Sequence, residues 1–124
     1  MTEEPIPGDI RDFILAHIGS VAQLEALLLL RADAAREWRI PSAAQRLYID
    51  EAGAFDVLNH LCIHGLVARD GEIYRYAPAT DELRRMVDRL ADAYARYLIP
   101  VTNIIHNNPL RLRRFADAFR FRKD

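Results

Sequence analysis

The sequence has very little cysteine and no long hydrophobic run. Its single thiol, Cys62, excludes an internal disulfide and a zinc site built on thiolates, and we expect it to be a small core residue. The longest apolar run, residues 26–30, is far shorter than the roughly 20 residues that cross a bilayer. The chain begins with Met-Thr-Glu-Glu, which is acidic, whereas a secretion signal begins with positive charge. We therefore expect a cytoplasmic protein with no membrane partner.

The chain also lacks an excess of positive charge, because 17 Lys and Arg stand against 18 Asp and Glu, for a formal net charge of −1. Non-specific affinity for nucleic acid comes from cations, so their distribution matters more than the total. Residues 50–64 hold Asp50, Glu51 and Asp56 and no cation, for −3, whereas residues 109–124 hold six cations and two acidic residues, for +4. The basic end of the chain is therefore separate from segment 50–64.

No arrangement of residues typical of an enzyme is present. There is no Gly-rich phosphate loop and no Ser/His/Asp spacing, and His17 and His106 are isolated in the sequence. His60 and His64 are four residues apart, which is a metal-ligand spacing, but Cys62 would point roughly 160° away from the helix face that they share. The alternative, two surface histidines, is favoured. We expect no enzymatic activity, no metal and no cofactor.

What the sequence does contain is a helix followed by a hairpin, between residues 50 and 76. Asp50 is a suitable N-cap, because its carboxylate can accept hydrogen bonds from the free amides of the first turn. Residues at helical spacing then form an apolar face: Ala54, Val57, Leu58, Leu61 and Cys62. Asp56, Asn59 and His60 fall on the opposite face. Gly65 is predicted to end the helix in the left-handed conformation.

Two runs of strand-forming residues, 66–69 and 72–76, follow Gly65. They are joined by Asp70-Gly71, a pair that suits the two positive φ angles of a type I′ turn. The sequence therefore predicts a β-hairpin over residues 66–76, centred on Asp70-Gly71.

The first part of the chain is expected to be helical after a short leader. Residues 1–8 contain two prolines and one glycine and should form a flexible leader without core contacts, so that residues 9–124 make up a single domain. Helices are predicted over residues 9–18 and from Val21 to residue 34 or 36. Ser20 and Gln23 fit a capping box at the start of the second helix.

A short strand, residues 37–40, and a short helix from Ser42 come next.

The helix 51–64, Gly-Leu-Val and the hairpin resemble the second half of a winged helix-turn-helix. The residues that carry this resemblance are Leu58, Leu61, Gly65, Leu66, Val67 and Asp70-Gly71. The order of elements resembles that of the MarR-like dimeric regulators. The resemblance implies a mainly α fold with a small β-hairpin wing and C-terminal helices for dimerisation, but winged helices bind DNA, RNA or proteins.

Compared with MarR-like proteins, the positions that would face the major groove are Phe55, Asp56, Asn59, His60 and Ile63. The family commonly has Arg, Lys, Ser or Thr there, since base edges and phosphates need hydrogen-bond donors. Here only Asn59 and His60 could contact base edges, and Asp56 would lie unfavourably close to phosphates. The resemblance therefore implies a DNA-binding transcriptional regulator whose contacts with double-stranded DNA are weak and made mainly to the backbone.

The remaining candidates for DNA contact surround this helix: Arg39, Ser42, Arg46, Arg69 and Arg75. The two arginines of the wing could reach a minor groove or the backbone, and Arg39 and Arg46 could contact phosphates. The alternative for each arginine is a solvated surface residue.

A protein–protein interaction module that does not bind DNA is the competing hypothesis. Phe55 and Ile63 lie on the face of helix 50–64 that should be exposed, and Asp and His surround them, as is typical of an interface. The alternative is that the first helix or a second copy of the chain covers them. The two functions are nearly balanced, with a slight preference for the regulator that comes from the resemblance of fold alone.

After the wing, Thr80 is predicted to cap a long helix that starts near Asp81 and has Pro100 inside it, where the proline should kink or interrupt the helix. If it is continuous to about residue 107, this element is some 40 Å long at 1.5 Å per residue. Its apolar residues recur every four and three positions: Leu83, Val87, Leu90, Tyr94, Tyr97, Val101 and Ile104. A seam this long suits a partner helix, so we expect a homodimer held by residues 81–121. Phe115 and Phe119 of a last short helix would extend the interface. The alternative is a chain that folds back at Pro100 and covers its own seam.

Overall fold

The computed structural model describes residues 5–108. Within them, the elements in chain order are α1 (Gly8–His17), α2 (Val21–Ala32), α3 (Ile40–Leu47), α4 (Glu51–Ile63), β1 (Val67–Asp70), β2 (Ile73–Tyr76), α5 (Asp81–Arg96) and α6 (Leu98–His106). The fold is mainly α-helical with one antiparallel hairpin, which is compatible with a winged helix.

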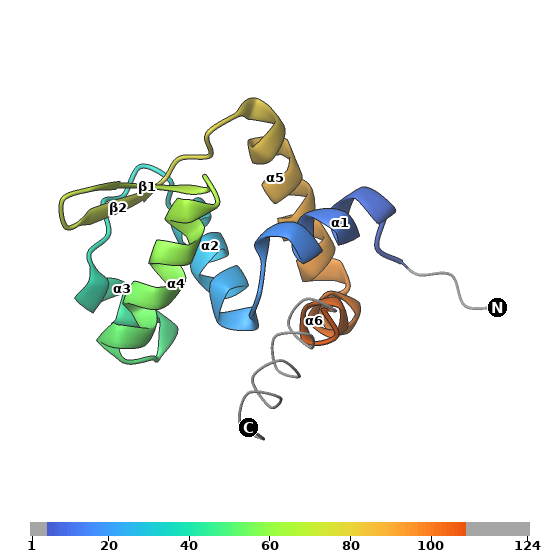
Figure 1. The fold of residues 1–124 in the computed structure, drawn as a ribbon, viewed down its shortest axis with the longest axis horizontal. Helices are drawn as coiled ribbons and strands as arrows, with labels where there is room; N and C mark the ends of the chain where they lie inside the picture. The colour runs from blue at the N-terminus through green and yellow to red at the C-terminus, as the bar shows by residue number, and fades with distance from the viewer. Residues whose placement is uncertain (1–4, 109–124) are drawn as a thin grey trace, which may run out of the picture.

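The helix α2 lies in the middle of the molecule (Figure 1). On one side of it are α3, α4 and the hairpin, which we call the wing half, and on the other are α1, α5 and α6, which we call the helical half. The side chains of Leu24, Leu27 and Leu30 on α2 are fully buried. The hydroxyl of Tyr94 on α5 donates to Glu25 of α2 at 3.1 Å. The central helix therefore links both halves through one hydrophobic core.

Three helices begin at the caps that the sequence predicts. The side-chain oxygens of Ser20, Asp50 and Thr80 each accept a hydrogen bond from the backbone N–H three residues later, at 3.1, 2.7 and 3.1 Å. Such caps satisfy amides that have no partner inside the helix. Gly65, at φ +74°, ends α4 in the left-handed region as predicted.

The hairpin forms as expected, but its turn is displaced by one residue. Asp70 pairs with Ile73, so the turn consists of Gly71 and Glu72 rather than of Asp70 and Gly71. Gly71 has φ +62°, and of the described residues other than glycine only Tyr48 has a positive φ. A type I′ turn needs two positive φ angles, so that prediction is wrong.

The predicted strand at residues 37–40 is reduced to a single bridge. Trp38 and Tyr74 exchange two backbone hydrogen bonds, of 2.8 and 2.7 Å, and Ile40 already begins α3. Pro41 lies in the first turn of α3, where its missing N–H would have no partner in any case. The helix therefore starts two residues before Ser42.

The leader is shorter than predicted, because Ile6 is only 3% exposed and belongs to the hydrophobic core. Gly8 is already the first residue of α1. The segment 5–8 therefore contacts the core through Ile6, whereas its prolines and glycine had suggested that it would not.

The long helix is interrupted close to Pro100, as the sequence predicts. The chain breaks at Tyr97, and Figure 1 shows that α6 runs in a different direction from α5. Pro100 has no N–H for the carbonyl of Arg96, and its ring would collide with that carbonyl in a continuous helix. In the first turn of a separate helix, which α6 provides, proline is tolerated.

Most of the apolar seam is covered by the same chain. Val87, Leu90 and Val101 are 0% exposed and Ile104 is 7% exposed. Leu83 and Tyr94 are half-buried against the core, and Tyr97 is exposed. The inference that this seam requires a second chain is therefore wrong, although the homodimer itself stays a prediction.

Phe115, Phe119 and the predicted last helix lie outside the described residues. Within residues 5–108, no single helix has both the length and the apolar character needed to cross a membrane; α1 and α2 meet the criterion only as a pair bent by 104°.

Candidate functional site

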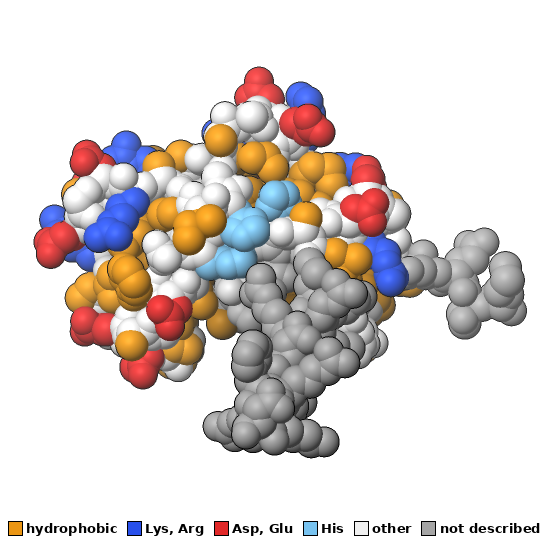
Figure 2. Space-filling model, in the orientation of Figure 1, with side chains coloured by type: hydrophobic (Ala, Val, Ile, Leu, Met, Phe, Trp, Pro, Cys, Tyr) orange, Lys and Arg blue, Asp and Glu red, His pale blue; other side chains and the backbone are white. Residues whose placement is uncertain are grey.

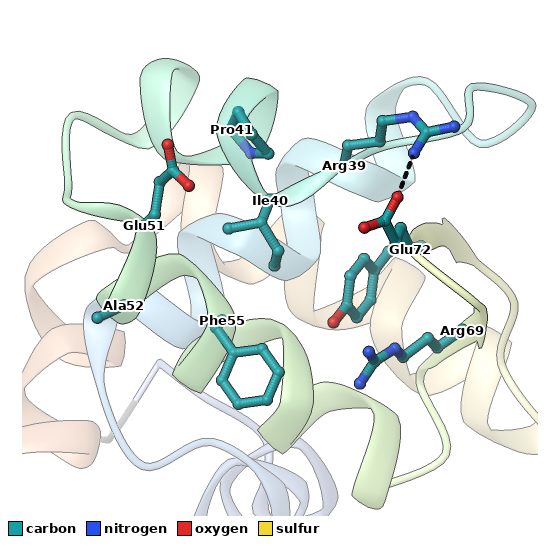
Figure 3. A pocket seen from close by; sticks show the side chains of 9 residues that line it. Arg39, Ile40, Pro41, Glu51, Ala52, Phe55, Arg69 and Glu72 are labelled. Atoms are coloured by element: carbon teal, nitrogen blue, oxygen red, sulfur yellow. Dashed lines mark hydrogen bonds and ion pairs between the residues drawn. The ribbon is translucent and has the colours of Figure 1, made fainter.

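A cavity of about 530 Å³ opens between the start of α3, the first half of α4 and the hairpin (Figure 3). Its apolar lining residues are Ile40, Pro41, Ala52, Phe55 and Tyr74, and its charged ones are Arg39, Glu51, Arg69 and Glu72. Three residues that the sequence singled out for DNA or protein contact, Arg39, Phe55 and Arg69, therefore share one surface.

Two of the candidate arginines are already paired with carboxylates. Arg39 Nη1 donates to Glu72 Oε2 at 3.1 Å at one side of the cavity (Figure 3), and Arg75 Nη2 donates to Glu37 Oε2 at 3.0 Å. All four side chains are largely exposed. Exposed pairs contribute little free energy and are screened by salt, so each guanidinium can exchange its partner.

The other two arginines lie near aromatic rings. Arg69 donates through Nε to the carbonyl of Gly71 at 2.7 Å, and its guanidinium carbon is 5.9 Å from the ring centre of Phe55. Arg46 lies 5.7 Å from the ring of Trp38, which Arg36 covers more closely at 3.8 Å. Both guanidinium groups lie within cation–π distance of a ring and remain exposed to solvent.

Of the polar candidates, Ser42 is occupied within its own helix turn. Its hydroxyl donates to the carbonyl of Arg39 at 3.0 Å and accepts from the Arg39 N–H at 3.3 Å. Asn59 is half-buried on α4. The sequence singled it out, together with His60, for contact with a base edge.

Tyr74, at the cavity wall, was missed by the sequence reasoning. It is only 1% exposed, and its hydroxyl is buried without a hydrogen-bond partner among residues 5–108. Burial raises the pKa of this phenol, an effect that the positive charge of Arg69 partly offsets.

The exposed face of α4 is apolar and acidic, as the sequence predicts. Phe55 is 41% exposed and Ile63 74% exposed, so neither the first helix nor the core covers them. Tyr48, 94% exposed and in the left-handed conformation at φ 58°, precedes the helix. No Lys or Arg lies on α4, whereas Glu51, Asp56 and the N-cap Asp50 carry carboxylates.

The other end of α4 carries a group of histidines, visible as one patch in Figure 2. His60 Nε2 lies 2.6 Å from the backbone oxygen of His17, which accepts its N–H, and His17 Nδ1 lies 3.0 Å from His64 Nδ1. The rings of His60 and His64 are stacked, with centroids 4.2 Å apart. The ring of His60 thus contacts the end of α1, and His17, which looked isolated in the sequence, belongs to this group. No local pattern connects residues more than 40 positions apart, so the sequence could not reveal this contact.

Among residues 5–108, no opposite charge acts on the pKa values of His17 and His64. Burial lowers the pKa of His17, and the repulsion of His60 lowers it further. Burial likewise lowers the pKa of His64, followed by repulsion from His60 and His17. Burial also raises the pKa of the neighbouring Cys62 thiol. No group of three or more His, Cys, Asp or Glu side chains within the described part of the chain has a geometry that could hold a metal ion.

Comparisons with known proteins support the fold only. Neither a protein-family model nor a curated protein matches the chain. The structure is similar to the crystal structure of RV1404 from Mycobacterium tuberculosis, with a TM-score of 0.51 and 14% sequence identity over 89% of this chain and 82% of that one. At this identity the similarity concerns the arrangement of the elements and not the activity.

Proposed function

We propose that the protein is a winged-helix transcriptional regulator that binds double-stranded DNA weakly, through phosphate contacts. The observation that carries this proposal is that four exposed arginines lie on α3, at its N-cap and on the hairpin, the elements that pack against α4. Arg39 and Arg46 lie on the α3 side, and Arg69 and Arg75 lie on the hairpin. Guanidinium groups on both sides of a helix next to a hairpin suit the two phosphate backbones that flank a groove.

The face between these arginines explains why the affinity is expected to be weak and tolerant of sequence. Asp56 is exposed there, and α4 with its cap carries a formal charge of −3. Asn59 is the remaining base-edge candidate, since His60 binds the carbonyl of His17. Phosphate contacts fix the position of a protein on DNA but carry no sequence information.

Charge reversal of the wing tests this proposal. The double variant Arg69→Glu and Arg75→Glu should weaken binding to all duplexes alike and make the slope of log K against log salt shallower by about 2. Its matched control is Arg85→Glu with Arg96→Glu, which changes the net charge equally on the exposed face of α5. Nanomolar binding to one operator that the wing variant leaves unchanged would contradict the proposal.

A second candidate, a protein-binding module, is favoured by one observation. Phe55 and Ile63 are exposed on α4, while two of the four bordering arginines are paired with carboxylates. Exposed apolar side chains with a polar rim are typical of protein interfaces. A photo-crosslinking residue at position 63, compared with one at position 85 on α5, tests this candidate. One discrete adduct at position 63 in cells, together with no duplex binding at low salt, would favour it over the regulator.

The homodimer remains part of the proposal, with a different contact surface. Tyr97, Leu98 and Ile99 are 41%, 50% and 63% exposed and adjacent at the break between α5 and α6. Val101 is buried, so a charge there would disturb folding and not only association. Leu98→Glu with Ile99→Glu should therefore give monomers in sedimentation equilibrium. A single species near 14.2 kDa for the unmodified chain at tens of micromolar would exclude the dimer.

A further inference from the structure

The last turns of two helices meet at the histidine cluster. His17 is the last residue of α1, His60 lies in the last turn of α4, and His64 is the residue that follows α4. Backbone carbonyls at a helix C-terminus lack partners within the helix. The carbonyl of His17 is one of these, and the ring of His60 supplies its hydrogen bond at 2.6 Å. The cluster therefore joins the end of α1 in the helical half to the end of α4 in the wing half.

The hydrogen bonds restrict the number of protons that the cluster can hold. A carbonyl oxygen only accepts, so His60 must carry its proton on Nε2. His17 and His64 face each other through Nδ1 at 3.0 Å, which requires a proton on one Nδ1 and a lone pair on the other. One of these two rings can be positively charged without losing the bond. If both are charged, two N–H groups point at each other and the contact becomes repulsive.

The charged groups around this contact are the histidines themselves. His60 acts on His17, and His60 and His17 act on His64; no carboxylate, lysine or arginine among the described residues acts on either ring. On the α1 side, the neighbouring ring is that of Phe13, 4.7 Å from His17. From the end of α6, Asn108 donates its amide to the carbonyl of Leu15 at 3.3 Å, and this group is neutral. Within the part of the chain that the structure describes, no acidic group acts on His17 or His64 to compensate a second positive charge.

We propose that His17, His60 and His64 form a proton-operated clamp between α1 and α4. The clamp is closed when the facing pair His17 and His64 holds at most one extra proton, and the second proton opens it. Opening separates the end of α1 from the end of α4 and so loosens the wing half from the helical half. The clamp does not depend on whether the partner of the wing half is DNA or protein.

The environment of the His17 and His64 rings determines whether acid opens or closes the clamp. Burial and mutual repulsion keep the pKa values of His17 and His64 below the usual value, so the closed form resists protonation at neutral pH. Protons taken up in acid therefore favour the open form. Because the pair shares one bond, its two protonation steps are coupled and belong to the pair.

Amide hydrogen exchange tests the clamp in the full chain. The N–H of Ile18 donates to the carbonyl of Ile14 at 2.8 Å, immediately after His17, and reports on the end of α1. The N–H of Tyr74, bonded to the carbonyl of Trp38 at 2.7 Å, is the reference in the hairpin. Between about pH 7.5 and pH 5, after correction for intrinsic rates, protection at Ile18 should fall at least about tenfold relative to Tyr74. Equal changes at both amides would overturn the proposal.

A variant removes the titration and keeps a hydrogen-bonding group. In His64→Gln the amide can still bond to His17 Nδ1, so the relative protection of Ile18 should lose most of its pH dependence. His106→Gln, at the exposed end of α6, is the matched control and should behave like the unmodified protein. If His64→Gln retains the full pH dependence, the clamp is excluded.

Nitrogen NMR of the unmodified protein gives a result even if the variant fails to fold. At about pH 7.5 the spectra should show one protonated and one bare Nδ1 in the pair His17 and His64, followed by two coupled steps in acid. Two bare Nδ1 atoms, or two independent titrations at the usual value for histidine, would contradict the clamp.

Discussion

The two ends of α4 lie in opposite electrostatic environments. Beside its first half, arginines and carboxylates alternate around an open cavity, and Arg39 pairs with Glu72 in solvent. At its last turn, His60 and His64 meet His17 without any carboxylate acting on His17 or His64 among residues 5–108. The first end has exposed and exchangeable charge pairs, and the second has partly buried rings of a single kind.

Because of this difference, salt concentration and pH should act on opposite ends of α4. Exposed ion pairs and phosphate contacts weaken as salt rises, because the Debye length is only about 8 Å at physiological ionic strength. Imidazoles titrate close to neutral pH, and partly buried ones are screened much less. We therefore expect salt to govern binding at the first end of α4, and pH to govern the contact of the second end with α1.

Removal of the imidazole of His60 should have the largest effect on stability. His60→Ala leaves the carbonyl of His17 without its 2.6 Å hydrogen bond, and the free energy of unfolding should fall by about 1–2 kcal/mol. Chemical denaturation at neutral pH measures this. Asn59→Ala, on the adjacent position of the same helix, is the control and should cost less than about 0.5 kcal/mol. Equal losses for both variants would show that the histidine contact contributes nothing specific.

Acid should destabilise the protein through the same end of α4. The pKa values of His17 and His64 in the folded protein lie below the usual 6.5, so the unfolded chain binds protons first as the pH falls. Stability is therefore fully present above about pH 6.5 and declines toward their lowered values. Arg89 lowers the pKa of Asp9, so the stability that this ion pair contributes is lost in a separate range, below pH 3.8. Thermal unfolding measured across pH should show less decline for His64→Gln, and an unchanged decline would refute this origin.

At the opposite end, loss of the helix cap should lower the stability but leave the pH dependence of unfolding near neutral pH unchanged. Asp50 accepts the N–H of Gly53 at 2.7 Å, and Asp50→Ala should cost about 1 kcal/mol. Asp56→Ala, exposed on the same helix, is the matched control for charge, with an expected change below about 0.5 kcal/mol. If the cap variant also altered the pH dependence of unfolding, the two ends of α4 would not be independent.

The smallest expected effect is a gain in DNA affinity when a competing carboxylate is removed. Glu72→Gln frees Arg39 and Glu37→Gln frees Arg75, and each should strengthen duplex binding about two- to fivefold at low salt. Glu82→Gln, exposed at the start of α5, changes the net charge equally at a distant position. Fluorescence anisotropy measures the three affinities. Equal gains in all three would mean that only the net charge matters.

The sequence predicted the elements whose limits depend on neighbouring residues. Ser20, Asp50 and Thr80 act on amides three positions away, and the left-handed Gly65 ends its own helix. Such signals are contained in a few residues and need no knowledge of the tertiary fold.

The hairpin register shows where local patterns become insufficient. A turn at Asp70 and Gly71 would have placed Val67 opposite Tyr74, whereas the structure pairs Val67 with Tyr76. A shift of two residues keeps the same side chains on the same face, so the alternation of apolar residues cannot distinguish the two registers. In the structure, the backbone of Tyr74 instead bonds to that of Trp38, which lies more than 30 residues earlier in the sequence.

The course of the chain in the helical half and the partners of the residues in the candidate site depend on tertiary contacts. No local pattern in the sequence predicts such contacts. The spacing from Val87 to Ile104 is equally consistent with a partner helix and with a chain that folds back, and the structure shows the second within residues 5–108. The arginines were found from the sequence because they border a recognisable motif. Their carboxylate partners and the meeting of His17 with His64 were not, since folding alone brings these residues together.

The salt dependence of duplex binding by the unmodified protein tests the central proposal most directly. Four arginines that contact phosphates predict a slope of log K against log salt of about −3 to −4 per bound subunit, similar for random and upstream genomic DNA. The measurement is made at constant pH near 7.5, where the histidine clamp is closed. A slope near zero, or no binding to any duplex at low salt, would contradict the account and leave the protein-binding module as the function that the α4 surface supports.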